Sequence, residues 1–285
     1  MEVNKSQGCL LGLAIGDALG APVEFRKAGS FEPVTGYRAG GEFNLRAGQY
    51  TDDASMALCL AESLRVCRDM NLLDQCQRYW NWYAYGENSS TGECFDIGDG
   101  TKEALETWWQ TGKLSPSPTG LGNGCIMRLA PIPIFYSDTI DAARYSQLSA
   151  TTTHGHPDAL KATGFFGGLL SLALNGCSKE ELMRDVPQDY RKIEIIPSGH
   201  VVESLNAAIW AFETTDSFED AVLKAVNLGG DADTIGAITG QLAGAFYGLS
   251  GIPHHLVLGL QDYEHFLDVA RRLTALCPLV KSGYI

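Results

Sequence analysis

The chain has 285 residues, of which 45% are hydrophobic and 19% charged, a composition typical of a globular protein that can bury a sizeable core. Its formal net charge of −13 argues against nucleic acid as a partner, because a protein that neutralises phosphates needs a basic face. The eight cysteines form no C-x-x-C pair and lie in apolar runs, as Cys59 does between Leu58 and Leu60. We therefore expect reduced, buried thiols and a cytoplasmic location.

The first predicted helix carries a regular series of glycines, and a later apolar segment, residues 235–247, repeats their spacing. A glycine inside a helix costs about 1 kcal/mol relative to alanine, so we expect close packing of helix backbones to compensate. The pattern leaves open whether these two helices pack on each other or on other helices. The glycines are Gly8, Gly12, Gly16 and Gly20 in the first series and Gly236, Gly240, Gly244 and Gly248 in the second.

The apolar run at residues 8–15 could imitate the core of a signal peptide. Glu2 and Lys5 precede it and Asp17 interrupts it, so we interpret the run as a buried helix rather than an export signal. No stretch approaches the length of a membrane span, and we expect no membrane association.

A long irregular segment follows this helix. Pro22 ends or bends the helix, Glu24 lies in the turn behind it, and residues 28–50 are rich in glycine without clear periodicity. A loop of this length in a compact domain is often a functional lid, and this one connects Glu24 to the next polar cluster. An ordinary surface loop is the alternative.

Two clusters combine hydroxyl and carboxylate groups, and each opens an apolar helical run. The first cluster is Thr51, Asp52 and Asp53, and the second is Asp231, Asp233 and Thr234, directly after Gly229 and Gly230. Such oxygen ligands suit Mg²⁺, Mn²⁺ or Ca²⁺ rather than zinc. For either cluster alone an ordinary helix N-cap is the alternative, because Thr and Asp pair with free N–H groups and with the helix dipole. Together with the glycine pair, the two clusters favour one metal site closed by segments far apart in the sequence.

The next segments carry helical periodicity at residues 54–70 and 72–85, and residues 101–109 read as a short helix. Between Gly120 and Arg128, three glycines and an asparagine can expose backbone N–H groups to an anion, and Arg128 adds a positive charge suited to phosphate or carboxylate. The stretch lacks the lysine and spacing of a P-loop and follows no predicted strand, so it is not a dinucleotide-binding fingerprint. A glycine-rich turn with a structural arginine is the alternative.

His154 and His156 precede a predicted helix at residues 158–174. Without cysteine or glutamate at metal-ligand spacing they give no zinc signature, and a histidine that caps the helix is the simpler interpretation. Further helices are predicted at residues 200–212, 218–226 and 257–276. Because convincing strands are almost absent, we predict an all-α fold in a single domain over residues 1–285.

Several of these motifs in one order resemble the ADP-ribosylglycohydrolase family, especially bacterial members related to dinitrogenase reductase-activating glycohydrolase. The matching segments span nearly the whole chain. They are residues 12–20 with Glu24; Thr51, Asp52 and Asp53; Phe95, Asp96, Ile97 and Gly98; Gly122, Asn123 and Gly124 with Met127 and Arg128; Thr153 and His154; and Gly230, Asp231, Ala232, Asp233 and Thr234.

The resemblance implies an all-α fold with a binuclear Mg²⁺ or Mn²⁺ centre, and hydrolysis of the glycosidic bond between ADP-ribose and an acceptor, usually a protein side chain. By the family pattern, the metal ligands would be Thr51, Asp52, Asp53, Asp231, Asp233 and Thr234. The ADP-ribose cleft would be lined by Gly98, Asn123, Gly124, Cys125, Met127, Arg128, His154, His200, Gly229 and Gly230. His200 is a departure, because the nitrogenase-regulating relatives commonly have tyrosine there, and it leaves recognition of the adenosine end open.

Glu24 and Asp96 are the candidate catalytic carboxylates. Attack at the ribosyl C1″ requires a positioned water and a base that takes its proton. Asp96 could instead hold a departing guanidinium, since carboxylate and guanidinium match as a fork. We therefore expect ADP-ribosyl-arginine on protein as the substrate. Hydrolysis of serine-linked or other O-linked ADP-ribose, a non-catalytic ADP-ribose-binding relative and a two-metal pyrophosphate hydrolase are the alternatives.

Overall fold

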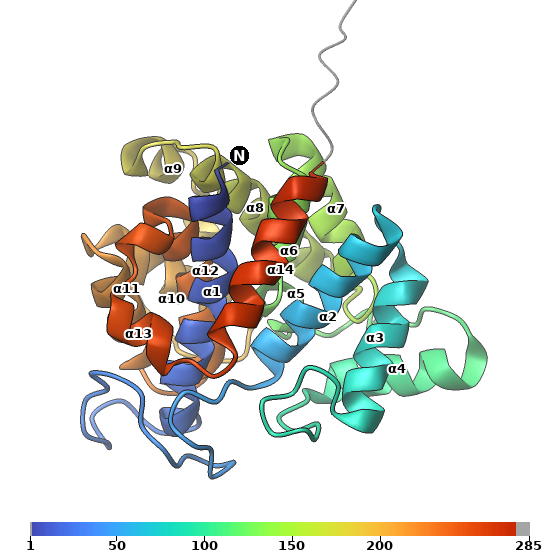
Figure 1. The fold of residues 1–285 in the computed structure, drawn as a ribbon, viewed down its shortest axis with the longest axis horizontal. Helices are drawn as coiled ribbons and strands as arrows, with labels where there is room; N and C mark the ends of the chain where they lie inside the picture. Colours follow the sequence, from blue (N-terminus) through green and yellow to red (C-terminus); the bar gives the residue numbers. More distant parts are fainter. Residues whose placement is uncertain (1, 278–285) are drawn as a thin grey trace, which may run out of the picture.

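The structure is a computed structural model that describes residues 2–277 (Figure 1). Within this range the chain forms helices and isolated bridges but no strand, so the predicted all-α class is confirmed. The longer helices are α1 (Val3–Gly20), α2 (Asp52–Cys67), α3 (Leu72–Tyr85), α4 (Asp99–Thr111), α7 (Thr139–Ala150), α8 (Pro157–Leu174), α10 (Val201–Glu213), α11 (Phe218–Val226), α12 (Ala232–Tyr247) and α14 (Tyr263–Leu276). Shorter ones are η1 (Ala21–Val23), α5 (Gly124–Met127), α6 (Pro131–Phe135), α9 (Lys179–Arg184), η2 (Gln188–Tyr190), η3 (Leu249–Gly251) and α13 (His254–Gly259).

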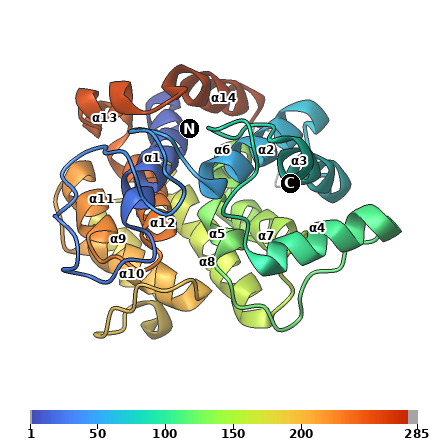
Figure 2. The ribbon, with the colours of Figure 1, turned by 90° about the horizontal axis from the view of Figure 1, so that it is seen from below.

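Helices α1 and α12 form the central pair of the fold, and they lie side by side in both views (Figures 1 and 2). Their two glycine series face each other along the whole contact. A Cβ atom added at Gly12 would overlap the carbonyl oxygen of Gly240, and one added at Gly240 would overlap that of Gly12. The expected close approach is therefore confirmed, and each helix is the partner of the other.

The same pair explains why both helices are so apolar. Every residue of α12 from Ala232 to Ala245 is buried, and α1 is buried from Gly8 to its end at Gly20. Neighbouring helices α14, α11, α10 and α2 cover the remaining sides of the pair (Figures 1 and 2). In the part of the chain that the structure describes, no helix is both long and apolar enough to cross a bilayer.

Asp17 connects α1 to α2. Its Oδ1 accepts a hydrogen bond from the backbone N–H of Thr51 at 2.8 Å, and its Oδ2 accepts one from Ala54 at 3.0 Å. A carboxylate from α1 thus satisfies free N–H groups in the first turn of α2. The C-terminal end of α1 and the N-terminal end of α2 are held together, and α12 begins beside them.

The irregular segment between η1 and α2 is a loop without a helix, as expected, and it borders one end of the molecule (the blue loops at the lower edge of Figure 1). On the other side of the same end, α4 follows a second loop and begins next to Gly98. The helix ends and loops that carry the polar motifs of the sequence therefore gather in one region.

Candidate active site

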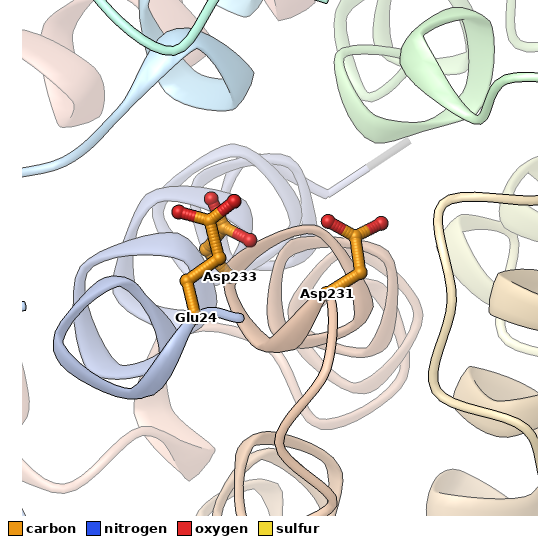
Figure 3. Close-up of side chains that lie close together, drawn as sticks. All are labelled: Glu24, Asp231 and Asp233. Carbon is orange, nitrogen blue, oxygen red and sulfur yellow. The ribbon is translucent and has the colours of Figure 1, made fainter. Parts of the chain in front are cut away.

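A group of carboxylates lies where α1 ends and α2 and α12 begin. Glu24, Asp231 and Asp233 bring carboxylate oxygens within 4.8 Å of one another, and Asp52, Asp96 and Asp233 do the same. Figure 3 shows the first three side chains directing their carboxylates toward the same side of the ribbon. Because Asp233 belongs to both groups, the two groups are adjacent.

Local backbone geometry places these side chains. Asp52 and Asp233 lie in the first turns of α2 and α12, so both project from helix N-termini. Gly229 and Gly230 have φ of 68° and 63°, and a Cβ at Gly230 would overlap the carbonyl oxygen of Pro197. Only glycine fits this turn without strain, so the pair shapes the loop that presents Asp231.

The Glu24 turn is tied to this loop through its backbone. The N–H of Phe25 donates to the carbonyl of Gly230 at 2.7 Å, and the N–H of Gly230 donates to the carbonyl of Arg26 at 2.8 Å. Asp96 comes from the loop before α4 and has a positive φ of 61°, which costs energy in a residue with a Cβ. A strained carboxylate beside four others is typical of a functional position rather than a packing requirement.

The carboxylates are buried without compensating cations. Oxygen atoms of Glu24, Asp53, Asp96 and Asp233 have no hydrogen-bond partner, although they are inaccessible to solvent. None of these four carboxylates forms an ion pair with a lysine or arginine of the described chain. Since burying an unpaired carboxylate is costly, these are oxygens that could hold a cation. The donor set consists of hard oxygen atoms, which fits Mg²⁺ or Mn²⁺.

Burial raises the pKa of these carboxyl groups, and neighbouring carboxylates raise it further. The pKa of Asp96 rises to about 7 and that of Glu24 to about 10, in both cases chiefly through desolvation. The pKa values of Asp52, Asp53 and Asp233 lie well above the usual range for the same reason. A bound divalent cation would reverse these shifts by stabilising the charged form.

The threonines connect the two clusters that the sequence keeps apart. The Thr51 hydroxyl lies 3.3 Å from Oδ2 of Asp53 and 3.2 Å from Oδ2 of Asp233, and the Thr234 hydroxyl lies 3.3 Å from Oδ2 of Asp53. Thr51 and Asp231 occupy the N-cap positions of α2 and α12, yet neither side chain makes a capping hydrogen bond. The N-cap alternative therefore does not explain these two residues.

A cleft of about 450 Å³ opens beside the carboxylates. Its walls combine the acidic group with the glycine-rich stretch and with His154. The predicted site residues that line it are Glu24, Asp52, Asp96, Gly98, Asn123, Gly124, Met127, His154, Asp231, Asp233 and Thr234.

Glycine residues leave room beside His154 in this cleft. A Cβ at Gly122 would lie 3.3 Å from Nε2 of His154, and one at Gly124 would lie 3.2 Å from its Cε1. Asn123 is fixed between them, because its Nδ2 donates to Oγ of Ser204 at 2.8 Å and also to Oδ2 of Asp231. The amide thus joins the glycine-rich wall to the carboxylate group.

Hydrogen bonds connect the buried Arg128 to His154 through Thr153. Arg128 Nη2 donates to the Thr153 hydroxyl at 2.7 Å, and this hydroxyl lies 2.8 Å from His154 Nδ1. Since arginine can only donate, the hydroxyl accepts from it and keeps its own proton and a second lone pair for the contact with Nδ1. Burial, together with Arg128, lowers the pKa of His154 to about 3. His154 is therefore neutral, and its Nε2 lies on the side of Gly122 and the cleft.

Several predicted residues lie behind the cleft wall rather than on it. Arg128 is 1% exposed, with its guanidinium 4.9 Å from the Tyr79 ring centre, so it acts on the cleft through Thr153 and His154. His200 caps α10 by accepting from the N–H of Val202, and His156 caps α8 in the same way. The other predicted residues that do not line the cleft are Thr51, Asp53, Cys125, Gly229 and Gly230.

The cleft also includes residues that the sequence motifs did not single out as site residues. Phe25 is the clearest, because it lines the cleft with 64% of its surface exposed and a φ of 60°. Its position directly after Glu24 was the available signal. The others are Asp99, Gly100, Thr101, Ser117, Gly120 and Gly199, while Ile97, Gly122 and Thr153, which also line the cleft, belong to the matched motifs.

The fold and the site together define an all-helical protein with a buried acidic centre beside a cleft. A sequence model of the ADP-ribosylglycohydrolase family matches residues 2–282, and the chain belongs to this family.

Among curated relatives, the chain is similar to ADP-ribosylarginine hydrolase Tri1 of Pseudomonas putida (strain GB-1), with 38% identity over 98% of this chain and 80% of the relative. It is also similar to ADP-ribosyl-[dinitrogen reductase] glycohydrolase of Rhodospirillum rubrum, with 30% identity over 97% of this chain and 96% of the relative. A solved structure titled "ADP-ribosylglycohydrolase-related protein complex" superposes with a TM-score of 0.86 and 39% identity, covering 97% of this chain and 99% of that one.

Proposed function

We propose that the protein is a metal-dependent hydrolase that removes ADP-ribose from arginine side chains of modified proteins. The observation that carries the proposal is the acidic centre, in which buried carboxylate oxygens lack any partner beside a cleft. Family membership and the names of the relatives support the reaction class and the arginine linkage.

Two divalent cations, Mg²⁺ or Mn²⁺, fit the acidic centre. One would be held near Asp52, Asp96 and Asp233 and the other near Glu24, Asp231 and Asp233, because these are the two groups of converging oxygens. Asp53, Thr51 and Thr234 complete the oxygen-rich surroundings through their contacts with Asp233 and with each other. When bound, such cations position ribose hydroxyls and lower the pKa of a coordinated water.

The chain's own residues supply the remaining functions. Glu24 or Asp96 takes a proton from the attacking water, since both carboxylates line the cleft and each has an oxygen without a partner. The neutral His154 contributes its Nε2 as a hydrogen-bond partner for the ADP-ribose. Asn123 holds the glycine-rich wall of the cleft in position against Asp231 through its hydrogen bond.

Phe25 and Asp96 account for arginine as the leaving group. An exposed aromatic face next to carboxylates attracts a planar cation, because the ring quadrupole and the negative charges act in the same direction. A guanidinium can stack on the ring while it pairs with Asp96. A serine-linked substrate offers no such group, so the geometry favours the arginine linkage.

A substrate panel tests the proposal. Arginine-linked, serine-linked and poly-ADP-ribose substrates are incubated with the protein in Mg²⁺, in Mn²⁺ or in EDTA, and the products are weighed by mass spectrometry. We expect free ADP-ribose and unmodified arginine, with metal only. AMP with ribose phosphate would identify a pyrophosphate hydrolase instead. Full activity in EDTA would exclude the metal centre, and the absence of hydrolysis would indicate a non-catalytic relative.

A further inference from the structure

A second cavity, of about 570 Å³, lies in the loop between η1 and α2. The same short segment lines both openings, since Glu24 and Phe25 face the cleft whereas Pro22 and Arg26 line this second cavity. The loop forms the blue border of the molecule in Figures 1 and 2. A group bound in the cavity would therefore lie next to the cleft.

Two arginines converge on one aromatic ring in this cavity. The guanidinium carbons of Arg26 and Arg38 lie 5.6 Å and 5.8 Å from the centre of the Phe31 ring. The ring is itself fixed, because Phe31 packs against the core and against the backbone at Gly229. Both cations are thus held in a fixed position relative to the loop that carries Asp231.

Neither guanidinium is neutralised within residues 2–277. Arg26 Nη2 donates to the carbonyl of Ser30 at 2.9 Å, and Arg38 Nη1 donates to the carbonyl of Glu32 at 2.8 Å, but neither forms an ion pair with a carboxylate. Arg38 Nη2 is inaccessible to solvent and has no hydrogen-bond partner. The carbonyls orient the two cations and leave donors for an anion.

Two neighbouring cations repel each other, and Glu32, which lines the same cavity without forming an ion pair in the described chain, offsets this repulsion only in part. The pKa of Arg38 is lowered, first by burial and then by Arg26, whereas Glu32 acts in the opposite direction. The rest of the chain has ample acidic residues for pairing, given its net charge of −13. An oxyanion from outside the chain would relieve the repulsion and pair with two guanidinium groups at once.

We propose that Arg26 and Arg38 form a docking pocket for an acidic side chain of the ADP-ribosylated acceptor protein. The inference rests on the proposed function and names the kind of acceptor segment that the enzyme prefers. The pocket adjoins the cleft through residues 22–26, so an aspartate or glutamate near the modified arginine reaches it while the ADP-ribose occupies the cleft. The pocket also offsets the repulsion that an acidic acceptor meets from an acidic enzyme.

Modified peptides test the pocket directly. Two peptides carry one ADP-ribosyl-arginine each, flanked on both sides by glutamates in the first and by glutamines in the second. For the wild-type enzyme we expect a KM about fivefold lower for the glutamate peptide, which corresponds to about 1 kcal/mol in total for charge pairing at a partly exposed site. The kcat values should agree, because the contact is remote from the reacting bond.

Variants of the two arginines test whether the pocket causes the preference for the glutamate peptide. Arg26→Gln, Arg38→Gln and the double variant should remove the preference for the glutamate peptide while leaving turnover of free ADP-ribosyl-arginine unchanged. Arg144→Gln is the matched control, because Arg144 is exposed on α7, lies 5.6 Å from the Tyr145 ring centre and changes the charge equally. It should keep the preference. Arg26 is exposed, so its replacement tests the pocket even if Arg38→Gln lowers stability.

The outcomes separate this proposal from the proposed function. Failure to hydrolyse free ADP-ribosyl-arginine would contradict the proposed function, whereas hydrolysis without any peptide preference would contradict the docking pocket alone. A preference that survives in the double variant would also overturn the pocket. Binding of inorganic phosphate is measured by calorimetry as a further test. If phosphate binds only when both arginines are present, and no peptide preference is seen, the pocket is a site for a free anion and acceptor docking is rejected.

Discussion

A substitution at Glu24 can distinguish a role in proton transfer from a role in ADP-ribose binding. Its side chain is 4% exposed, and one carboxylate oxygen has no partner. Glu24→Gln keeps the shape but removes the proton acceptor, so we expect kcat to fall about 10²–10⁴-fold. Affinity for ADP-ribose, measured by calorimetry with Mg²⁺, should change much less. A wild-type rate in single-turnover hydrolysis would remove Glu24 from the mechanism and leave Asp96 as the base.

Asp96 is expected to contribute to linkage choice. Its strained backbone and unpartnered Oδ2 indicate that it is held for a ligand rather than for packing. Asp96→Asn should depress turnover of arginine-linked substrate with little loss of ADP-ribose affinity. If calorimetry shows that ADP-ribose affinity collapses together with turnover, Asp96 acts only through the metal or the nucleotide, and its pairing with a guanidinium is rejected.

Phe25 is expected to act through its ring face. Phe25→Leu keeps an apolar side chain but removes the quadrupole, so we expect kcat/KM for ADP-ribosyl-arginine to fall about fivefold, in line with about 1 kcal/mol for a partly exposed cation–π contact. Phe25→Tyr retains the ring and serves as the control, with activity near wild type. Equal activity of the leucine and tyrosine variants would show that the ring contributes only bulk.

Residue chemistry explains which of the predicted site residues the structure brings together. Aspartates next to glycines and at helix starts led us to expect Asp52, Asp231 and Asp233 in one site, whereas Asp96 was expected there only from the family resemblance; their carboxylates lie close together in the structure. The orientation of Arg128 depends instead on Tyr79, which is distant in sequence and carries no motif. A contact of this kind has no local signature, and the arginine that a linear motif assigns to the cleft proves to lie behind it.

At the scale of helices, the α1–α12 contact predicts that alanine destabilises the protein at a glycine of this contact but not at a helical glycine elsewhere. Gly240→Ala places a methyl group inside the backbone of α1, which cannot yield without separating the helices. We expect a loss of stability of about 1–3 kcal/mol or more, together with loss of activity, because α12 carries Asp233. Thermal unfolding and hydrolysis rate measure the two effects.

Gly168→Ala in α8 is the matched control for this prediction. A Cβ there meets its nearest atom at 3.7 Å, which is an ordinary contact. Since alanine is the better helix former by about 1 kcal/mol, this variant should be neutral or more stable. Equal destabilisation by both substitutions would mean that the helix interior, and not the close backbone contact, requires glycine.

Helix positions were predictable where periodicity was strong, and less so where turns divide an apolar run. We expected one or two helices over residues 257–276, and the structure has two, α13 and α14, separated by Asp262 in a left-handed conformation with φ of 57°. Aspartate can adopt that conformation at some cost in energy, so no glycine marks the break. The pairing of α1 with α12 could not be predicted either, because a glycine series indicates that another backbone packs closely but not which one.

For the whole molecule, the acidic centre predicts that stability without metal falls as pH rises. Burial raises the folded-state pKa of Asp17 to about 7 and of Asp96 to about 7, above their unfolded values. The folded state then binds more protons than the unfolded state between about pH 4 and pH 7, so stability is lost through this window. Glu24, with a pKa of about 10, extends the loss to higher pH. Calorimetric melting in EDTA across this range measures the slope.

Divalent cation should reverse this dependence, because metal competes with protons for the same oxygens. We expect Mg²⁺ or Mn²⁺ to raise the melting temperature more at pH 8 than at pH 6. Asp233→Asn is the control, since it removes one of the repelling charges and the ligand shared by both groups. It should stabilise the metal-free protein and abolish the gain from metal. A metal effect that is independent of pH would argue that the cation binds elsewhere.

The glycine faces of α1 and α12 also determine when the molecule can fold during synthesis. About 200 residues separate the two helices, so the nascent chain exposes its first apolar helix long before its partner leaves the ribosome. At roughly 5–20 residues per second, the delay is on the order of ten to forty seconds. During that time α1, which lacks a polar face, has to be shielded by a chaperone or by transient burial. The acidic centre therefore cannot form before α12 has been synthesised, because α12 carries Asp233.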